Sequence, residues 1–522
     1  MMNPTMMNPV ADKPELAEPH IGGWLASLGL GVEYTRSAGN SLYYRDAEGA
    51  EVEVLDLVGG YGSTILGHNN PDIVDYAKSL LDGGTPVHAQ FSKHPYANDL
   101  AWKLNTILHR EFGVTEHYSA VFANSGAEAN EVAIKHAEMD RVLKIGAALA
   151  AVEANLDAVA ATGAAIGATA PLPAAAGGID ELVAAVRAAN AERAATPPVY
   201  LAPEGSFHGK LAASVQLTHN PGYRTPFSAM AAQARFVPLE RTDVIAKTIE
   251  AERKTLLDLA VDGGVVHVVE RPIPAVSAFI LEPIQGEAGI RVLDRDAVAR
   301  LRDLLDAEDI PVIVDEVQSG MGRSGAFFAS SHLGVRGDYI TLAKSLGGGI
   351  AKAAITLIRA SRYRDDFELV HSSTYAKDSF STQIAIRVVE LLEADGGEAY
   401  RLATRQGEKL LAALRSLRDE FSDVVKEVRG KGLMAGLEFH DLTGSGSEVI
   451  SEQAAGGLIG YLFSGYLLRE HNLRVFPTAS ATNTLRFEPS IHITDEEIAR
   501  TATGLRALIE VVRAEDGKTL LG

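Results

Sequence analysis

Residues 311–349 read PVIVDEVQSGMGRSGAFFASSHLGVRGDYITLAKSLGGG and contain two short apolar runs that each lead to a charged residue. The first run ends at Asp315, and the second ends just before Lys344, which a flexible glycine turn follows. Continuous apolar runs of strand length are typical of strands that are buried on both faces of a parallel sheet. The stretch therefore predicts an α/β domain in which Asp315 and Lys344 stand at strand ends.

The chain around this stretch fits the same class. Strands alternate with helical segments, and further strands are expected at Tyr118–Phe122, Val199–Ala202 and Ala278–Leu281. Because single cores stop growing beyond roughly 250–300 residues, we expect 522 residues to form a large and a small domain. The predicted parts are a segment of the small domain at 1–95, the large domain at 96–375, an Ala-rich insertion at about 144–198, and the C-terminal small domain at 376–522.

Local signals predict several elements outside the central strands. Ile179–Arg193 has an amphipathic pattern, and Asp180 could cap that helix. Two more helices are expected at Gln383–Leu392 and Glu398–Glu420. The segments LMAGLEF, LRVFP and LRFEP after them read as short strands of an α+β tail.

Composition narrows the possible functions. The chain has 48 basic and 68 acidic residues and a formal net charge of −20, which disfavours a nucleic-acid partner. It has no cysteine, which excludes disulfides, thiolate catalysis and Cys-ligated metals, and we expect no metal site. Residues 1–19 lack the features of a signal peptide, and no run of 18 apolar residues predicts a membrane span. We therefore expect a cytoplasmic protein.

The two strand-end residues suit a specific chemistry. A lysine beside desolvating residues can have a lowered pKa and can attack an aldehyde, although a surface lysine before a loop has the same local pattern. A buried carboxylate needs a donor or cationic partner. For Asp315 that partner could be a protonated ring nitrogen of a cofactor, a helix N-terminus or Arg323.

Two further motifs could hold a phosphorylated ring. Ser125-x-x-Glu128 has the spacing of a capping box, so a helix should start at Ser125, with the N–H groups of Gly126 and Ala127 free to bind phosphate. Capping boxes are common, so this motif alone is weak. In Gly205–Lys210, Phe207 could stack on a planar ring, whereas His208 fits a site residue and a core or interface histidine equally well.

Together the motifs resemble the class III aminotransferases, which include ornithine, acetylornithine and 4-aminobutyrate aminotransferases. The resemblance runs from about Ser41 to Ile493, apart from the insertion, and rests on VDEVQSGMGRSG, LAKSLGGG, EPIQGEAG and LRFEPSIHIT in the family's order. It implies fold type I, with a mainly parallel seven-stranded sheet in the large domain and a smaller α+β domain. It also implies pyridoxal 5′-phosphate (PLP) as cofactor. The implied reaction is ping-pong transfer of an amino group from an amine or ω-amino acid to a keto acid such as 2-oxoglutarate or pyruvate.

The resemblance also implies a role for each motif residue. Lys344 is the Schiff-base lysine and proton shuttle, and Asp315 pairs with the ring nitrogen. The other expected cofactor contacts are Ser125, Gly126, Ala127, Phe207, His208, Val317 and Gln318. Thr374 is expected to bind the phosphate of the neighbouring subunit, so the active form should be a homodimer. The expected substrate contacts are Tyr61, Lys210, Glu287 and Arg486.

Three departures from the family affect specificity. The separation of Ser125 and His208, 208 − 125 = 83 residues, is far longer than in the family and marks the insertion. Lys210 replaces a common arginine and cannot bind a carboxylate with two prongs. The segment after Thr374 reads Ala376-Lys-Asp-Ser where relatives have Gly-Gly-Asn-Pro.

The same residues are compatible with other functions. A PLP aminomutase or racemase, or a decarboxylating transaminase, would use the same first contacts. A catalytically silent PLP-binding protein is disfavoured because Lys344, Asp315 and Gln318 are all retained. A Rossmann dehydrogenase is disfavoured because no strand-linked G-x-G-x-x-G appears early in the chain.

Overall fold

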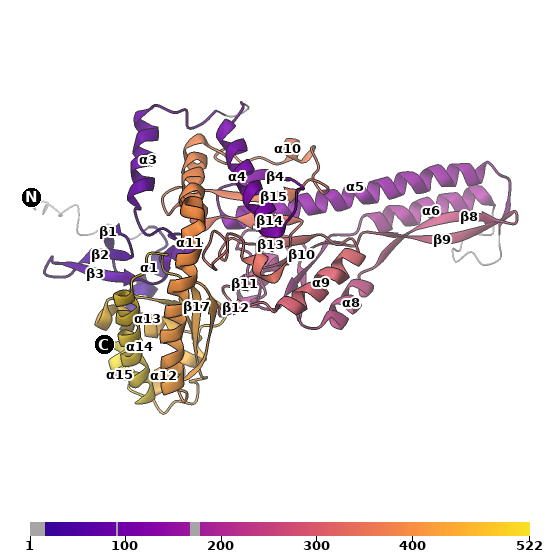
Figure 1. Cartoon of the computed structure of the whole chain (residues 1–522). Coiled ribbons are helices and arrows are strands. Elements are labelled where there is room, and N and C mark those ends of the chain that lie inside the picture. The colour runs from indigo at the N-terminus through magenta and orange to yellow at the C-terminus, as the bar shows by residue number, and fades with distance from the viewer. Residues whose placement is uncertain (1–15, 90–91, 167–177) are drawn as a thin grey trace, which may run out of the picture.

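The computed structural model describes residues 16–89, 92–166 and 178–522. A seven-stranded sheet lies at its centre (Figure 1). β15 is antiparallel to both of its neighbours, and the other neighbouring strands are parallel, which confirms the predicted mainly parallel sheet. In order across the sheet the strands are β4 (Tyr118–Ala123), β15 (Ala354–Arg359), β14 (Tyr339–Leu342), β13 (Val312–Asp315), β10 (Val276–Leu281), β6 (Val199–Pro203) and β7 (Ala234–Val237).

Helices cover both faces of this sheet, which explains why its strands are continuously apolar. Every residue of β10, β13 and β14 is buried. Phe279 packs in a core with Leu301, whereas the next residue, Ile280, packs in a second core with Ala133. Successive side chains of a strand point to opposite faces, so both positions need apolar residues. The helices around the sheet are α4 (Pro95–Phe112), α5 (Gly126–Ala160), α7 (Pro221–Arg224), α8 (Thr242–Ala251), α9 (Arg295–Ala307) and α10 (Phe367–Val370).

The C-terminal part forms a separate antiparallel sheet of four strands, ordered β16, β17, β20 and β19. The predicted short strands at LMAGLEF, LRVFP and LRFEP are confirmed. α11 breaks at residues 394–397, so the two predicted helices are confirmed as its halves. The elements are α11 (Ser379–Glu420), β16 (Val425–Lys431), β17 (Met434–Phe439), α12 (Glu448–Ala455), α13 (Ile459–His471), β18 (Leu473–Arg474), β19 (Phe476–Pro477), β20 (Thr484–Phe487), α14 (Asp495–Arg513) and α15 (Gly517–Leu521).

The N-terminal segment joins this C-terminal part, because β3 pairs in parallel with β18 through Leu55 and Leu473. That pairing supports a contribution of residues 1–95 to the small domain, while the boundaries at 95 and 375 stay predictions. The N-terminal elements are α1 (Pro19–Ser27), β1 (Tyr34–Ala38), β2 (Ser41–Arg45), β3 (Glu51–Asp56), α2 (Gly59–Gly62) and α3 (Pro71–Asp82).

An arm projects from the sheet (Figure 1). It contains the outer half of α5, helix α6 (Ile179–Ala194), strand β5 (Ala165–Ile166) and the hairpin of β8 (Lys254–Asp262) and β9 (Val265–Ile273). α5 is 35 residues long, which corresponds to about 52 Å at 1.5 Å per residue. The arm has a hydrophobic cluster of its own, which includes Leu156, Leu182, Val186, Leu256 and Val266.

The structure of the arm bears on two predictions. The described residues of the predicted insertion at 144–198 pack against the hairpin of β8 and β9, which supplies five of the twelve buried residues of the arm's cluster, while the bounds of the insertion stay a prediction. Asn190 fixes the hairpin, since its side chain donates to Leu257 O at 2.8 Å and accepts from Leu257 N at 2.7 Å. Asp180 does not cap α6, whose N-cap is Gly178; it lies in the first turn, where its charge favours the helix dipole.

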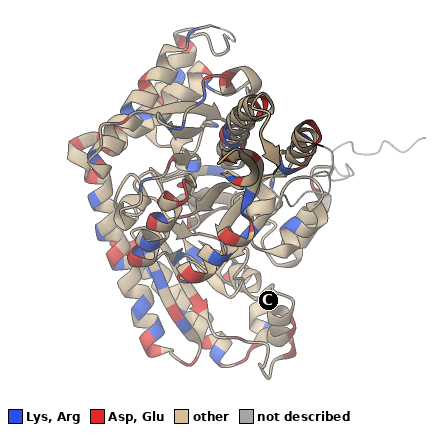
Figure 2. Ribbon diagram, turned by 90° about the vertical axis from the view of Figure 1, so that its right-hand side faces the viewer, with Lys and Arg blue, Asp and Glu red and all other residues tan. Residues whose placement is uncertain are grey.

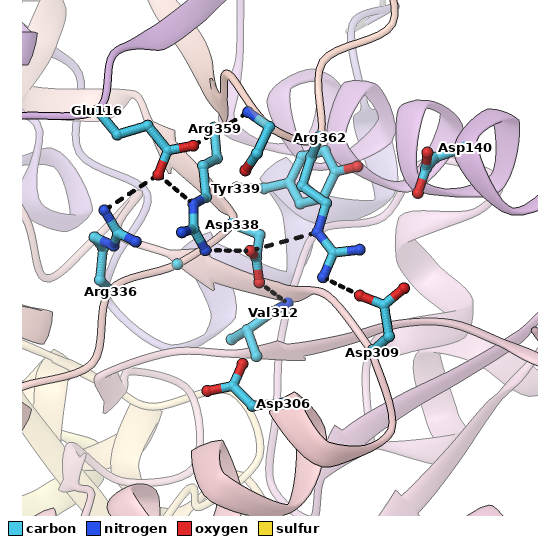
Figure 3. A network of polar contacts seen from close by, with 12 residues as sticks. Glu116, Asp140, Asp306, Asp309, Val312, Arg336, Asp338, Tyr339, Arg359 and Arg362 are labelled. Carbon is cyan, nitrogen blue, oxygen red and sulfur yellow. Dashed lines mark hydrogen bonds and ion pairs between the residues drawn. The ribbon is translucent and has the colours of Figure 1, made fainter.

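At the start of the central strands, a network of arginines surrounds the buried Asp338 (Figure 3). The Asp338 carboxylate accepts from Val312 N at 2.9 Å and from Arg302 Nη1 at 2.9 Å, and it pairs with Arg359 at 3.3 Å. Burial alone would raise the pKa of Asp338, but Arg302 and the other donors hold it below its usual value. The network joins β13, β14 and β15 at the edge opposite to Asp315 and Lys344, so we assign it a structural role.

Charges of both signs are interspersed over the helices of the face shown in Figure 2, where no single basic stripe runs along the ribbon. Among the described residues, no helix has both the length and the apolar composition that a membrane span requires.

Candidate active site

Asp315 and Lys344 lie close together because their strands are neighbours. Asp315 is the last residue of β13 and pairs with Thr341 of β14, and Lys344 comes two residues after the end of β14. The carboxyl ends of parallel strands meet at one edge of a sheet, where α/β proteins bind ligands. Lys344 has a φ of 48°, a left-handed conformation that is uncommon for a residue with a side chain and that occurs often at functional sites.

The Asp315 carboxylate is buried and held by polar groups from several elements. One oxygen accepts from Asn130 Nδ2 at 2.7 Å and lies 2.8 Å from His208 Nδ1, and the other accepts from Val317 N at 3.0 Å. Thr341 Oγ1 donates to Asn130 Oδ1 at 2.9 Å and so orients the amide. The carboxylate thus has a fixed position, and among the described residues no Lys or Arg pairs with it.

Arg323 is not that partner. It is fully buried and donates from Nη1 to Leu433 O at 3.1 Å and to Pro489 O at 2.9 Å. The contact with Asp315 places His208 beside the strand-end carboxylate. Asn130 was missed by sequence reasoning, although its position four residues after Gly126 places both on one face of α5.

The start of α5 forms the predicted cradle. Ser125 is the N-cap, and the capping box with Glu128 is complete. A Cβ atom on Gly126 would lie 2.5 Å from Val317 Cγ1, so only glycine lets the helix end approach this closely. The positive end of α5 and its free N–H groups suit a phosphate group.

These residues line a cavity of about 210 Å³. His208 Nε2 is buried there without a hydrogen-bond partner among the described residues. Eight predicted cofactor contacts line the cavity together, whereas Ser125 caps the helix outside it and Thr374 lies exposed in a turn. The lining comprises Gly126, Ala127, Asn130, Phe207, His208, Gly209, Glu282, Ile284, Asp315, Val317, Gln318, Ser319 and Lys344.

Burial controls the charge of Lys344. Desolvation lowers the pKa of this amine, and the nearby Glu488 and Glu287 carboxylates offset only part of that effect. Glu488 is a second residue that sequence reasoning missed, and it accepts from Gln318 Nε2 at 3.0 Å. Glu282 is also buried; desolvation, and then the charge of Asp315, raise the pKa of this carboxyl well above its usual value.

The predicted substrate residues form a second group near Lys344. Glu287 and Arg486 make a two-pronged buried ion pair, with Arg486 Nη1 at 2.8 Å from Glu287 Oε1 and a second bond from Nη2 to Oε2. Glu287 also accepts from Ala479 N at 2.6 Å. The Tyr61 ring lies 5.0 Å from Arg486 Cζ, and Lys210 Nζ lies 4.3 Å from the ring of Tyr223.

The donor set fits PLP. The α5 N-terminus suits the phosphate, and Val317 and Phe207 can pack on the two faces of a ring. The carboxylate of Asp315 can hold a protonated ring nitrogen, since it lines the cavity and none of the described Lys or Arg side chains pairs with it. Lys344 lines the same cavity with an amine of lowered pKa.

Comparisons with known proteins agree with this site. The model of the family "Aminotransferase class-III" matches residues 27–509. A putrescine aminotransferase from Pectobacterium atrosepticum is 29% identical over 472 residues, which are 90% of this chain and 80% of that protein.

Solved structures show the same fold. The ornithine aminotransferase of Toxoplasma gondii has a TM-score of 0.66 at 18% identity, with 93% of this chain and 92% of that chain covered. A transaminase from the marine bacterium Virgibacillus has a TM-score of 0.68 at 18% identity, with 92% and 93% covered.

Proposed function

Because the chain belongs to the class III aminotransferase family, whose members are PLP-dependent enzymes, we propose that it transfers an amino group from an amine or ω-amino acid to an α-keto acid. The acceptor is of the 2-oxoglutarate or pyruvate type, and both half-reactions use one site. The observation that carries this proposal is the meeting of Asp315, Lys344 and the α5 cradle in one cavity. The name of the relative, putrescine aminotransferase, supports a donor without a carboxylate.

Each residue has a distinct task in this proposal. PLP, when bound, supplies an electron sink for the charge that develops on the substrate carbon. Asp315 would hold the proton on the ring nitrogen, and Gln318 would be the partner of the ring hydroxyl. Phe207 and Val317 would fix the ring plane, and Gly126 and Ala127 would bind the phosphate at the helix end that Ser125 caps. His208 and Asn130 keep the Asp315 carboxylate in place.

Lys344 moves the proton. Its amine would hold the aldehyde of the cofactor when PLP is bound, and it would become free to move a proton once a substrate amine takes its place. Since burial lowers its pKa, the released amine is uncharged at a lower pH than an exposed lysine and can accept the proton of the substrate carbon. The same amine then returns the proton at a different atom, which is the net change of a transamination half-reaction.

One site must bind both an amine donor and a keto acid that carries a carboxylate. The Glu287–Arg486 pair can serve both kinds of substrate. A buried arginine without a partner is costly, so Glu287 neutralises it while an uncharged donor tail is bound. An incoming keto acid can replace Glu287 with a two-pronged bond of its own. Burial alone would raise the pKa of Glu287, but Arg486 holds it below its usual value, so the carboxylate stays charged. Lys210 is then an accessory cation for the acceptor.

Arg486→Ala should therefore damage the two half-reactions unequally. We expect the rate with 2-oxoglutarate to fall by about 10²-fold or more, because a charged hydrogen-bonded partner of the carboxylate is lost, while the rate with a carboxylate-free amine changes little. Single-turnover absorbance changes measure each half-reaction separately. Glu287→Ala should improve carboxylate-bearing donors relative to simple amines. Equal losses for Arg486→Ala would indicate a permanent structural pair and would favour an aminomutase or racemase.

We also propose a homodimer in which Thr374 completes the phosphate site of the partner. The segment around Thr374 exposes large apolar side chains: Leu369 is 86% exposed, Val370 66% and Tyr375 65%. Such side chains clustered on one segment favour an interface. Two identical sites, each completed by the other subunit, also fit the symmetry of most dimers.

Complementation tests the shared site. Lys344→Ala and Thr374→Asp protomers should each be inactive alone, because one lacks the amine and the other repels the phosphate. Each heterodimer then contains one intact site, so a random mixture should recover about a quarter of wild-type activity. Activity is measured after subunit exchange, with each variant exchanged against itself as the control. A fully active monomer in sedimentation would contradict the proposal.

A further inference from the structure

Glu488 is a fully buried carboxylate that lies beside the cofactor cavity, directly after β20. The N-terminal segment holds its backbone, because Glu488 N donates to Leu57 O at 2.7 Å. A Cβ atom on Gly59 would lie 2.4 Å from Glu488 O, so the chain also passes Glu488 closely at this glycine. Contacts between distant parts of the chain therefore fix the position of this side chain.

The charge of Glu488 is balanced by a buried arginine. One carboxylate oxygen accepts from Gln318 Nε2 at 3.0 Å, and the other, Oε1, has no hydrogen-bond partner among the described residues. Nε and Nη2 of Arg323 likewise have no partner in the described part of the chain. A Cβ atom on Gly62 would lie 3.4 Å from Glu488 Oε1 and 3.5 Å from Arg323 Nε, so the two groups border the same small space. Burial lowers the pKa of Arg323, and the charge of Glu488 offsets part of that effect.

The carboxylate determines which end of the Gln318 amide faces it. A carboxylate only accepts hydrogen bonds, so the amide must turn its nitrogen toward Glu488. The amide oxygen lies on the side of Gly286, where a Cβ atom would come within 1.8 Å of Gln318 Oε1. Gln318 also lines the cofactor cavity, and its nitrogen has a second N–H beyond the one that Glu488 accepts.

We propose that Glu488 is a positioning residue, which fixes the Gln318 amide so that its nitrogen, and not its oxygen, is presented to the ring hydroxyl of the cofactor. This inference rests on the proposed function, in which Gln318 is the partner of that hydroxyl. A donor at this place stabilises the ionised form of the hydroxyl, whereas an amide oxygen would repel it. Glu488 thus acts through Gln318.

Glu488→Gln tests this role, because its amide can donate as well as accept and leaves Gln318 free to turn round. In the PLP-loaded protein, the pH at which the cofactor absorbance titrates should rise by about one unit, since the ionised hydroxyl loses its donor. Loss of the negative charge alone would have the opposite sign, because it disfavours a cation at the Lys344 nitrogen. A purely structural role would lower the melting temperature and leave the titration in place. A titration at an unchanged or lower pH would therefore overturn the inference.

A double-mutant cycle shows whether Glu488 acts through the amide. Pyridoxamine phosphate keeps the ring hydroxyl but has no aldehyde, so calorimetry measures its reversible binding without turnover. Glu488→Gln and Gln318→Ala should each weaken this binding by about tenfold, as for one hydrogen bond to a charged group. The double variant should bind no more weakly than Gln318→Ala alone. Additive losses would show that Glu488 acts independently of Gln318 and would also overturn the inference.

Glu438→Gln is the matched control. Glu438 is buried on β17, which pairs with β20 in the same sheet, but its carboxylate pairs with Lys426 and Arg429. This variant should change neither the titration nor the binding of pyridoxamine phosphate. If the wild type transfers amino groups but Glu488→Gln behaves like Glu438→Gln, only this inference fails. If the wild type transfers none, the proposed function fails, and calorimetry still decides whether Glu488 positions Gln318.

Discussion

Lys344→Ala should lower turnover by about 10²–10⁴-fold or more, which is the range for loss of a general base alone. The substitution removes both the covalent anchor of the cofactor and the amine that moves the proton. The loss should appear in both half-reactions, because both require the same proton transfer. This distinguishes Lys344 from Arg486, whose substitution should damage the acceptor half-reaction only.

Two measurements check the assignment. Borohydride reduction of the loaded wild type, followed by peptide mapping, should find the cofactor-derived mass on the peptide that contains Lys344. Lys352→Ala is the matched control, since Lys352 follows the same glycine turn but is exposed, and it should be nearly as active as the wild type. A label on another lysine would show that the anchor has been misassigned.

Asp315→Asn should slow proton transfer by at least about a hundredfold, the scale of losing one preorganised electrostatic partner. The amide keeps the size of the side chain but removes the charge that holds a ring nitrogen protonated. It also places a donor among the donor groups of Asn130 and Val317. The cofactor should still bind, because the cradle and Lys344 are unchanged.

Absorbance of the bound cofactor and the single-turnover rate separate these effects. Asp338→Asn is a suitable control, because it removes a buried carboxylate at the opposite edge of the same sheet. It should lower the melting temperature, while the rate per folded, loaded site stays close to that of the wild type. A near-normal rate for Asp315→Asn would show that the carboxylate is not the partner of the ring.

The arm illustrates where local signals fail. The capping box of Ser125 and Glu128 predicts the start of α5 because its two hydrogen bonds lie within one turn. The association of the β8–β9 hairpin with that helix depends on Asn190 and on apolar contacts between segments far apart in the chain. No local pattern encodes such a partner, so the packing of the hairpin on the arm could not be predicted from the sequence.

The sequence by itself determined the family, the fold class, the cofactor and the residues that stand at the strand ends. Strand length, apolar continuity and helix capping depend on residues that are close together in the chain. The motifs around Asp315 and Lys344 also occur in the family's order. The tertiary structure alone decided which groups hold Asp315 and that the β8–β9 hairpin packs against α5 and α6. Those outcomes depend on burial and on contacts between distant segments, and hydrogen bonds and charges gain their strength only once packing has removed the water.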